Sequence, residues 1–291
     1  MSRNTPLKAD LSLVFIAFIW GTTFTVVKNA MEDIEPYAFL FLRFSLATLV
    51  ILPLILKTGR VKTLPWKPGL LAGLFLFIGF AAQTIGLQYT TASKSGFITG
   101  LNVVFVPIFA AMFEKRLLRR NSVIAVILAV FGLYLLTNPQ AQSFNRGDVW
   151  TILCAAGFAL HIIALDWYSR KVDYVGLFFL QILTVAILSG IAFPFENNGF
   201  ILIQHEITGN IIFAVVITAI FATAVAFFIQ NWAQRITTGT RTALILTMEP
   251  VFAAITAYFF LHERLGWMGL AGAGVILVAI IIAELRPSAN V

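Results

Sequence analysis

The sequence predicts an all-α membrane protein with ten transmembrane helices arranged as two inverted five-helix repeats. Three observations lead to this fold class: the composition, the placement of basic residues between apolar runs, and an internal repeat. Hydrophobic residues make up 59% of the 291 residues, charged residues only 11%, and the mean hydropathy is +0.91. A soluble domain carries about 25% charged residues, which it needs to cover its surface. We therefore exclude a soluble enzyme, a disordered chain and a secreted disulfide scaffold.

Ten apolar runs account for most of the chain. A helix that crosses a bilayer needs about 20 mostly apolar residues. The runs lack the alternation of apolar and polar residues that is typical of outer-membrane barrel strands. The first run has no small-residue cleavage site, so we expect a retained helix and not a signal peptide. The expected spans are 11–28, 36–56, 68–88, 95–113, 121–137, 148–167, 175–195, 211–234, 242–261 and 267–285.

The basic residues predict how these spans are oriented. Fifteen of the twenty Lys and Arg residues fall in segments that lie on one side if the ten spans alternate, and four fall on the other side. Cytoplasmic loops carry the excess of Lys and Arg. We therefore expect a multi-pass protein of the inner (cytoplasmic) membrane with both termini in the cytoplasm. The same pattern explains the net charge of +7 without a nucleic-acid partner.

An internal repeat predicts the architecture. A shift of 147 residues puts Phe80 on Phe227, Gln83 on Gln230 and Lys94 on Arg241, and a shift of 138 puts Trp20 on Phe158 and Arg43 on Gln181. Each unit then holds five spans, in residues 1–140 and 141–291. Because five is odd, the second unit must be inverted relative to the first. Inverted repeats of this kind are typical of secondary transporters, whose substrate site lies between the units near the membrane midplane.

Several short motifs carry a resemblance to a known family. Trp20, Gly21, Thr22, Thr23 and Phe24 resemble the W-G-[ST]-x-F signature of EamA-type permeases of the drug/metabolite transporter superfamily. The segments 90–101, 249–254 and 261–265 are similar to further elements of that family. The segment 113–117 departs from the expected G-E-R pattern. The resemblance implies ten spans, an inverted repeat, and export or exchange of small metabolites.

Two charged residues lie inside expected spans. Glu249 is about 10 Å deep from the start of its span, and Arg43 is about 10 Å from the other surface. A charge at this depth is costly and must face protein or water. Glu249 could bind substrate, carry a proton or cap backbone amides near Pro250. Arg43 could hold a substrate carboxylate or phosphate through a bidentate fork, or could join helices. A pair between the two residues is a further alternative.

Uncharged polar residues are the next candidates. Gln83 and Gln230 could line a polar cavity or hydrogen-bond across helices. His161 could relay protons or serve in packing, and Asn102 and Gln181 are similar cases.

Lys94 and Arg241 stand beside the N-terminus of a span, where a cation is unfavourable. A lipid head group, an acidic side chain or an anionic substrate could compensate each of them, and we expect them to reach the lipid head groups.

The aromatic candidates for a substrate wall are Trp20, Phe97 and Tyr134. Gly266, Gly269, Gly272 and Gly274 allow close packing of the last span, either within the chain or in a homodimer. The chain has one cysteine and no P-loop, dinucleotide fingerprint or HExxH motif. We therefore expect no cofactor, no metal and no enzymatic activity.

These observations favour a secondary transporter, an exporter or exchanger of small organic metabolites such as amino acids. It would work by alternating access to a central cavity, in a lipid bilayer and with possible proton coupling. The expected substrate-binding residues are Trp20, Arg43, Gln83, Phe97, Asn102, His161, Gln230 and Glu249. A channel or sensor, or an intramembrane enzyme, remain as alternatives.

Overall fold

The computed structural model describes residues 5–113, 115, 117, 120–136, 144–196, 208–237, 239–246 and 248–284. These residues form helices, and the described part of the chain has no strand. The first half contains α1 (Thr5–Ala30), α2 (Pro36–Lys57), η1 (Arg60–Thr63), α3 (Trp66–Tyr89), α4 (Ala92–Thr99), α5 (Asn102–Phe113) and α6 (Arg120–Leu136). The second half contains α7 (Arg146–Tyr168), α8 (Tyr174–Ala192), η2 (Phe193–Phe195), α9 (Gly209–Ile217), η3 (Thr218–Val225), α10 (Ala226–Gln234), α11 (Gly239–Leu246), α12 (Glu249–Phe260) and α13 (Trp267–Glu284).

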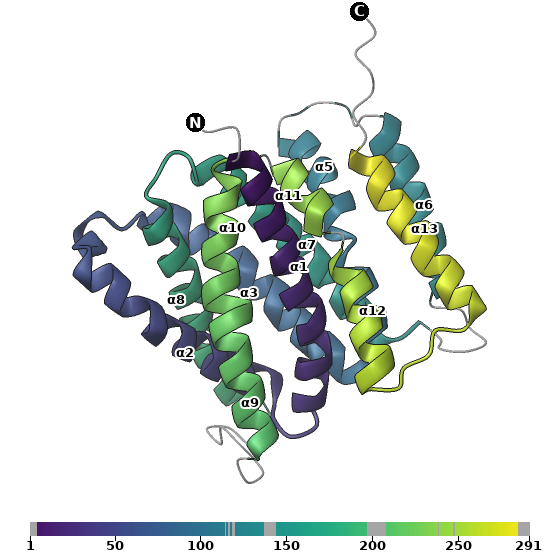
Figure 1. The fold of residues 1–291 in the computed structure, drawn as a ribbon, viewed down its shortest axis with the longest axis horizontal. Helices are drawn as coiled ribbons and strands as arrows, with labels where there is room; N and C mark the ends of the chain where they lie inside the picture. The colour runs from purple at the N-terminus through teal and green to yellow at the C-terminus, as the bar shows by residue number, and fades with distance from the viewer. Residues whose placement is uncertain are drawn as a thin grey trace, which may run out of the picture.

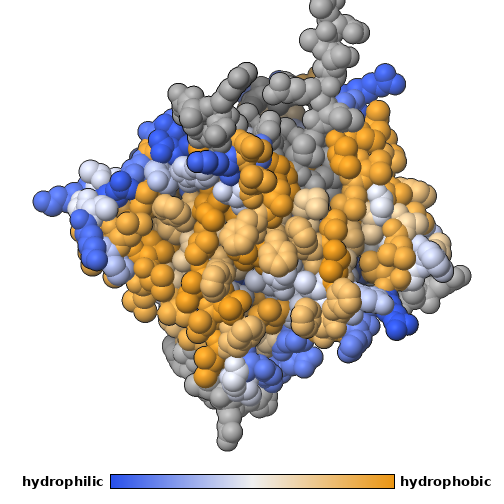
Figure 2. Space-filling view, in the orientation of Figure 1, coloured by the Kyte–Doolittle hydropathy of each residue, from blue (hydrophilic) through white to orange (hydrophobic). Residues whose placement is uncertain are grey.

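Seven helical segments are long and apolar enough to cross a membrane, and three shorter apolar helices accompany them. The three shorter ones are Val123–Gly132, Glu249–Phe260 and Trp267–Ala279, which fall in the expected spans 121–137, 242–261 and 267–285. Figure 2 shows a broad apolar band across the molecule, with hydrophilic residues gathered at opposite ends. This surface is that of a multi-pass membrane protein.

Two expected spans are interrupted, which corrects the prediction of continuous helices. The run 95–113 is divided into α4 and α5 at Gly100 and Leu101, and the run 242–261 is divided into α11 and α12. Pro250 explains the second break, because its ring lacks an N–H and clashes with the carbonyl of the residue four positions earlier, Leu246. Gly100 accompanies the first break, and a Cβ at Gly100 would lie 2.8 Å from Pro250 Cγ. The two breaks therefore meet in the interior.

The segments α9, η3 and α10 form one continuous helix, but its central turns are not α-helical. Residues Thr218–Val225 are wound as a π-helix, while the segments before and after them are α-helical. A π-helical turn inside an α-helix is rare and is frequently found at functional sites. Apolar periodicity does not reveal such a turn, so it could not be predicted from the sequence.

The two halves of the chain are interleaved. α3 packs along α7, α2 along α8, α6 along α13, and α1 along α12, so that each pair joins one helix of each half. Figure 1 shows α6 and α13 side by side at one edge of the molecule, and it places the start of α1 and the end of α13 at the same end of the bundle. This arrangement fits two related five-helix units that share one interior.

Glycines allow several of these helix pairs to approach closely. A Cβ at Gly157 of α7 would lie 2.7 Å from Gly79 N of α3, which is backbone and has little freedom to move. A Cβ at Gly132 of α6 would lie 2.9 Å from Gly272 O of α13, so Gly272 packs within the chain. Gly274, by contrast, has no atom within 4 Å of an added Cβ.

The end of α8 is tied to the start of α2 by one carboxylate. Glu196 accepts hydrogen bonds from the Tyr37 backbone N–H at 3.1 and 3.0 Å, one for each carboxylate oxygen. Burial raises the pKa of the Glu196 carboxyl from 4.5 to about 7, and the charge of Glu35 adds to the rise. Glu196 therefore takes up its proton more readily in the folded protein than in the unfolded chain.

We predict that Gly157→Ala lowers the thermal unfolding midpoint in detergent by several degrees. The added methyl group has to push two backbones apart, and overpacking of this kind costs about 1–3 kcal/mol. The matched variant Gly274→Ala, which adds the same group to open space, should leave the midpoint within about a degree of wild type. Equal midpoints for the two variants would show that α3 and α7 are not in close contact.

We predict a pH-dependent stability difference between the wild type and Glu196→Gln. The raised pKa of Glu196 means that its contribution to stability is present below about pH 4.5 and is lost as the pH rises through 7. The unfolding midpoint of the wild type should therefore fall relative to that of Glu196→Gln between about pH 5 and pH 8. Parallel curves for the two proteins over this interval would contradict the assignment.

Candidate functional site

A narrow cavity lies in the interior where the two helix breaks meet. Its free volume is about 40 Å³, so the cavity is narrow in this conformation. Both halves of the chain contribute to its walls, which combine aromatic rings with amide, imidazole, guanidinium and carboxyl groups. The lining residues are Trp20, Thr23, Phe24, Val27, Arg43, Phe80, Gln83, Leu87, Asn102, Phe158, His161, Ile162, Phe227, Gln230, Leu246 and Glu249.

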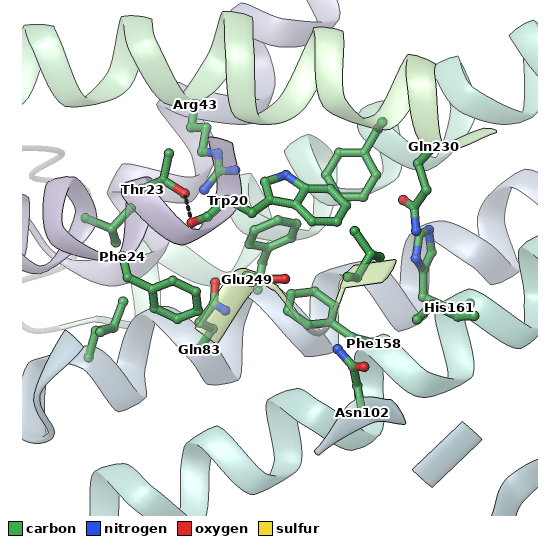
Figure 3. Close-up of a pocket in the computed structure, with 16 residues that line it drawn as sticks. Trp20, Thr23, Phe24, Arg43, Gln83, Asn102, Phe158, His161, Gln230 and Glu249 are labelled. Atoms are coloured by element: carbon green, nitrogen blue, oxygen red, sulfur yellow. Dashed lines mark hydrogen bonds between the residues drawn. The ribbon is translucent and has the colours of Figure 1, made fainter. Parts of the chain in front are cut away.

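Figure 3 shows how the polar groups are distributed along this cavity. Arg43 and Thr23 lie toward one end, His161 and Gln230 lie at the other end, and Glu249 is between them. Seven of the eight expected substrate-binding residues line the same cavity. The sequence therefore indicated groups that the fold brings together from helices far apart in the chain.

The helix breaks place Glu249 and Asn102 at the cavity. Glu249 is the first residue of α12 and Asn102 the first residue of α5. Both side chains are buried, with Glu249 only 8% exposed. A Cβ at Gly21 of α1 would lie 2.7 Å from Glu249 O, so only glycine lets α1 pass this close to the break. Irregular backbone is tolerated within a bilayer where it borders a polar cavity, and broken helices in both halves are typical of transporter sites.

Arg43 is held in place by the π-helix. Its Nε donates a hydrogen bond to Thr223 Oγ1 at 2.8 Å, and its guanidinium carbon lies 4.6 Å from the centroid of the Phe80 ring. The residue is 3% exposed. A second ring, Phe44, lies 5.3 Å from the same carbon. Arg43 therefore joins helices through Thr223 and also presents a fixed, planar cation to the cavity.

Trp20 contacts the same π-helical segment. Its indole Nε1–H donates to Ala222 O at 2.8 Å, and its ring lies 5.1 Å from that of Phe227. Because the indole has only one N–H, this bond fixes the ring and leaves its face as an apolar surface. Trp20 is a rigid wall of the cavity and not a donor to a ligand.

Three phenylalanines that were not among the expected site residues complete the aromatic wall. The Phe80 ring lies 5.1 Å from Phe158 and 5.9 Å from Phe227. Phe80 and Phe227 are equivalent under the shift of 147 residues, and Phe158 is equivalent to Trp20 under the shift of 138. The repeat was thus the signal that could have identified them, since a site between the repeats receives both members of each pair.

The amide groups contribute acceptors without partners. Among the described residues, Asn102 Oδ1 and Gln230 Oε1 are buried and have no hydrogen-bond partner. Gln83 Nε2 makes a long bond of 3.4 Å to Thr99 Oγ1. Buried polar groups are normally paired, so acceptors of this kind at a cavity wall suit a ligand or water molecules.

His161 makes one short hydrogen bond to another side chain. Its Nε2 lies 2.6 Å from Gln181 Oε1, and the ring contacts Phe227 at 5.8 Å. Both residues are buried, and Gln181 does not line the cavity. The Gln181 amide therefore orients the imidazole, whose edge borders the cavity.

Three candidates lie elsewhere. Phe97 of α4 is buried in an apolar cluster and does not line the cavity. Tyr134 is an exposed residue of α6. Lys94 does not reach lipid head groups as expected, because its Nζ forms a buried ion pair with Asp148 Oδ2 at 2.7 Å. The side chain of Arg241 lies outside the described residues.

Comparisons with known proteins agree with this architecture. The model of the EamA-like transporter family matches residues 7–138 and again residues 145–285. An uncharacterized transporter of Archaeoglobus fulgidus is 39% identical over 96% of this chain and 87% of its own length. An S-adenosylmethionine uptake transporter of Rickettsia bellii is 25% identical over 82% of this chain and 80% of its own length. A solved crystal structure with 19% identity superposes with a TM-score of 0.68 and covers 95% of this chain and 96% of that protein.

The fold and its interior site define a multi-pass membrane transporter. The chain belongs to the EamA-like transporter family.

Proposed function

We propose that this protein is a secondary transporter of small zwitterionic metabolites such as amino acids, bound in the cavity between Arg43 and Glu249. The observation that supports it most directly is that one cavity receives a buried cation from the first half of the chain and a buried carboxyl group from the second. The substrate carboxylate would bind Arg43, and the substrate ammonium group would bind Glu249.

Electrostatics favours a ligand that carries both charges. A charge away from water is costly unless a partner compensates it. The guanidinium of Arg43 has its Nε engaged by Thr223, so its remaining N–H groups are the donors suited to a carboxylate. Glu249 is acidic and so favours a cationic group, and it lies in the same cavity. A zwitterion satisfies both groups without adding net charge to the interior.

The aromatic wall favours a substrate with an apolar or flat part. Trp20, Phe80, Phe158 and Phe227 line the same space, and their rings contact one another. Such rings bind apolar side chains and also attract cations over their faces. S-Adenosylmethionine, named for one relative, combines an amino-acid group, a positively charged sulfonium and a flat base. It therefore belongs with apolar amino acids among the candidate substrates.

The helix arrangement supports alternating access. The breaks in both halves meet at the cavity, and each half contributes one member of the pairs Phe80 and Phe227, and Gln83 and Gln230. Two inverted units related in this way can rock about a fixed central site. The proposal includes export or exchange, with protons carried by Glu249. Placement of both termini on the cytoplasmic side of the inner membrane is part of the proposal.

A channel and an intramembrane enzyme are the competing functions. A channel conducts without saturation. Vesicles that contain a transporter and are loaded with unlabelled substrate instead take up labelled substrate by saturable counterflow. An enzyme requires a nucleophile and a base in contact. The cavity of the described residues instead offers single polar groups from separate helices, each suited to binding.

We predict saturable counterflow of apolar zwitterionic amino acids or S-adenosylmethionine in proteoliposomes. Arg43→Lys should reduce it at least tenfold, because an ammonium group does not reproduce the planar fork. Thr223→Val, which removes the acceptor for Arg43 Nε, should raise KM about tenfold while retaining most of the maximal rate.

Thr218→Val is the matched control for this experiment. Thr218 lies in the same π-helix, and its hydroxyl donates within that helix to Ala214 O. This variant should transport as the wild type does. Absence of counterflow for every zwitterion tested, or equal loss in the two Thr variants, would refute the proposed role of Arg43.

We predict that Glu249→Gln removes the pH dependence of transport. The amide has nearly the same shape as the carboxyl group, so the variant should elute from gel filtration as the wild type does. It does not titrate, so a proton can no longer be exchanged at this position. Counterflow measured between about pH 5 and pH 8 should be flat in the variant, an interval in which side-chain protons are exchanged near neutral pH. An unchanged pH profile would remove the proton role of Glu249.

A further inference from the structure

A buried ion pair joins the two halves of the chain at one end of the bundle. Lys94 of α4 and Asp148 of α7 are 2.7 Å apart, with side chains 1% and 0% exposed. The pair lies at the end where α1 finishes, because Lys28 near the end of α1 donates to Leu87 O near the end of α3, and α4 follows α3 directly. No part of the proposed binding site uses this pair.

Asp148 is held by bonds from both halves. Its Oδ1 accepts from Thr90 Oγ1 at 2.8 Å, and its Oδ2 accepts from the Asn145 backbone N–H at 2.9 Å. A second carboxylate acts nearby: Glu263, beyond α12, accepts from the backbone N–H groups of Ala92 and Ser93 at 2.8 and 2.9 Å. The N-terminus of α4 is thus attached to the second half through two acidic residues.

Helix stability does not explain a lysine at this place. A cation near a helix N-terminus is unfavourable, and a buried ion pair is close to neutral in free energy because desolvation offsets the Coulomb attraction. That balance suits a contact which must open and close. When the two helices separate, each charge regains water. The closed and open forms are therefore close in free energy.

The repeat relates both positions of the pair to charged residues of the opposite half. The shift of 147 residues puts Lys94 on Arg241, and the shift of 138 puts Asp10 on Asp148. Asp10 is in α1 and position 241 is in α11. The start of α1 does pack against α11: Ala9 and Leu13 share an apolar cluster with Leu246.

We propose that Lys94 and Asp148 form a latch that closes the cavity at the end where α4 begins. This inference rests on the proposed alternating access. Val27 and Leu87, in the last turns of α1 and α3, line the cavity on the side of the latch. Separation of α4 from α7 would open the cavity past these residues.

The test uses a single cysteine as a reporter of access. Cys154, the one native cysteine, is replaced by Ser, and Val27→Cys is introduced in the cavity wall. A membrane-impermeant thiol reagent is added to right-side-out or inside-out vesicles, and the labelling rate is measured. Asn29→Cys, at an exposed position near the end of α1, identifies the face on which α4 begins.

We predict that Lys94→Met with Asp148→Asn accelerates labelling of Val27→Cys at least tenfold, and only from that face. These changes preserve side-chain size and leave an acceptor for the Asn145 N–H. Thr90→Val, which removes one bond to Asp148, should give an intermediate rate. The matched control is the half-buried ion pair between Arg60 and Asp173, 3.2 Å apart, for which Arg60→Met with Asp173→Asn should change nothing.

Unchanged rates, or acceleration from both faces, would overturn the latch. The measurement needs no substrate, so expected labelling without zwitterion counterflow would reject the proposed substrate class and leave the latch standing.

Discussion

The structure depends on one constraint: backbone groups within a bilayer have no water to bind and must be satisfied by the protein. Continuous helices meet this requirement, and a break can persist only where other groups replace the lost bonds. Two helices are interrupted, between Thr99 and Asn102 and between Leu246 and Glu249. The two interruptions lie against each other in the interior. The polar cavity is the place where these breaks are tolerated.

The same constraint explains why the polar residues are interdependent. The π-helix between α9 and α10 supplies Thr223 to Arg43 and the Ala222 carbonyl to Trp20, so one irregular segment positions both a cation and an aromatic wall. Gln181 does the same for His161. Arg43, Trp20 and His161 are thus each oriented by a second polar group, which fixes their positions at the cavity wall.

Much of this site could be anticipated because the chain carries its architecture twice. Arg43 and Glu249 were identifiable as charges within apolar runs, and Gln83 and Gln230 as equivalent amides. Phe97, which was grouped with them, does not line the cavity, because the run that contains it does not show which face of α4 meets the interior. Lys94 was expected among lipid head groups because its partner Asp148 lies 54 residues away, in a different half of the chain.

The sequence alone determined that this is a multi-pass helical membrane protein of the EamA type, because apolar run length, charge placement and short motifs are local properties of the chain. Tertiary structure decided which residues share the cavity, where the helices break and which charges pair. Those outcomes depend on side-by-side packing between helices of opposite halves, and no local pattern encodes the face that a mostly apolar helix presents to its neighbours.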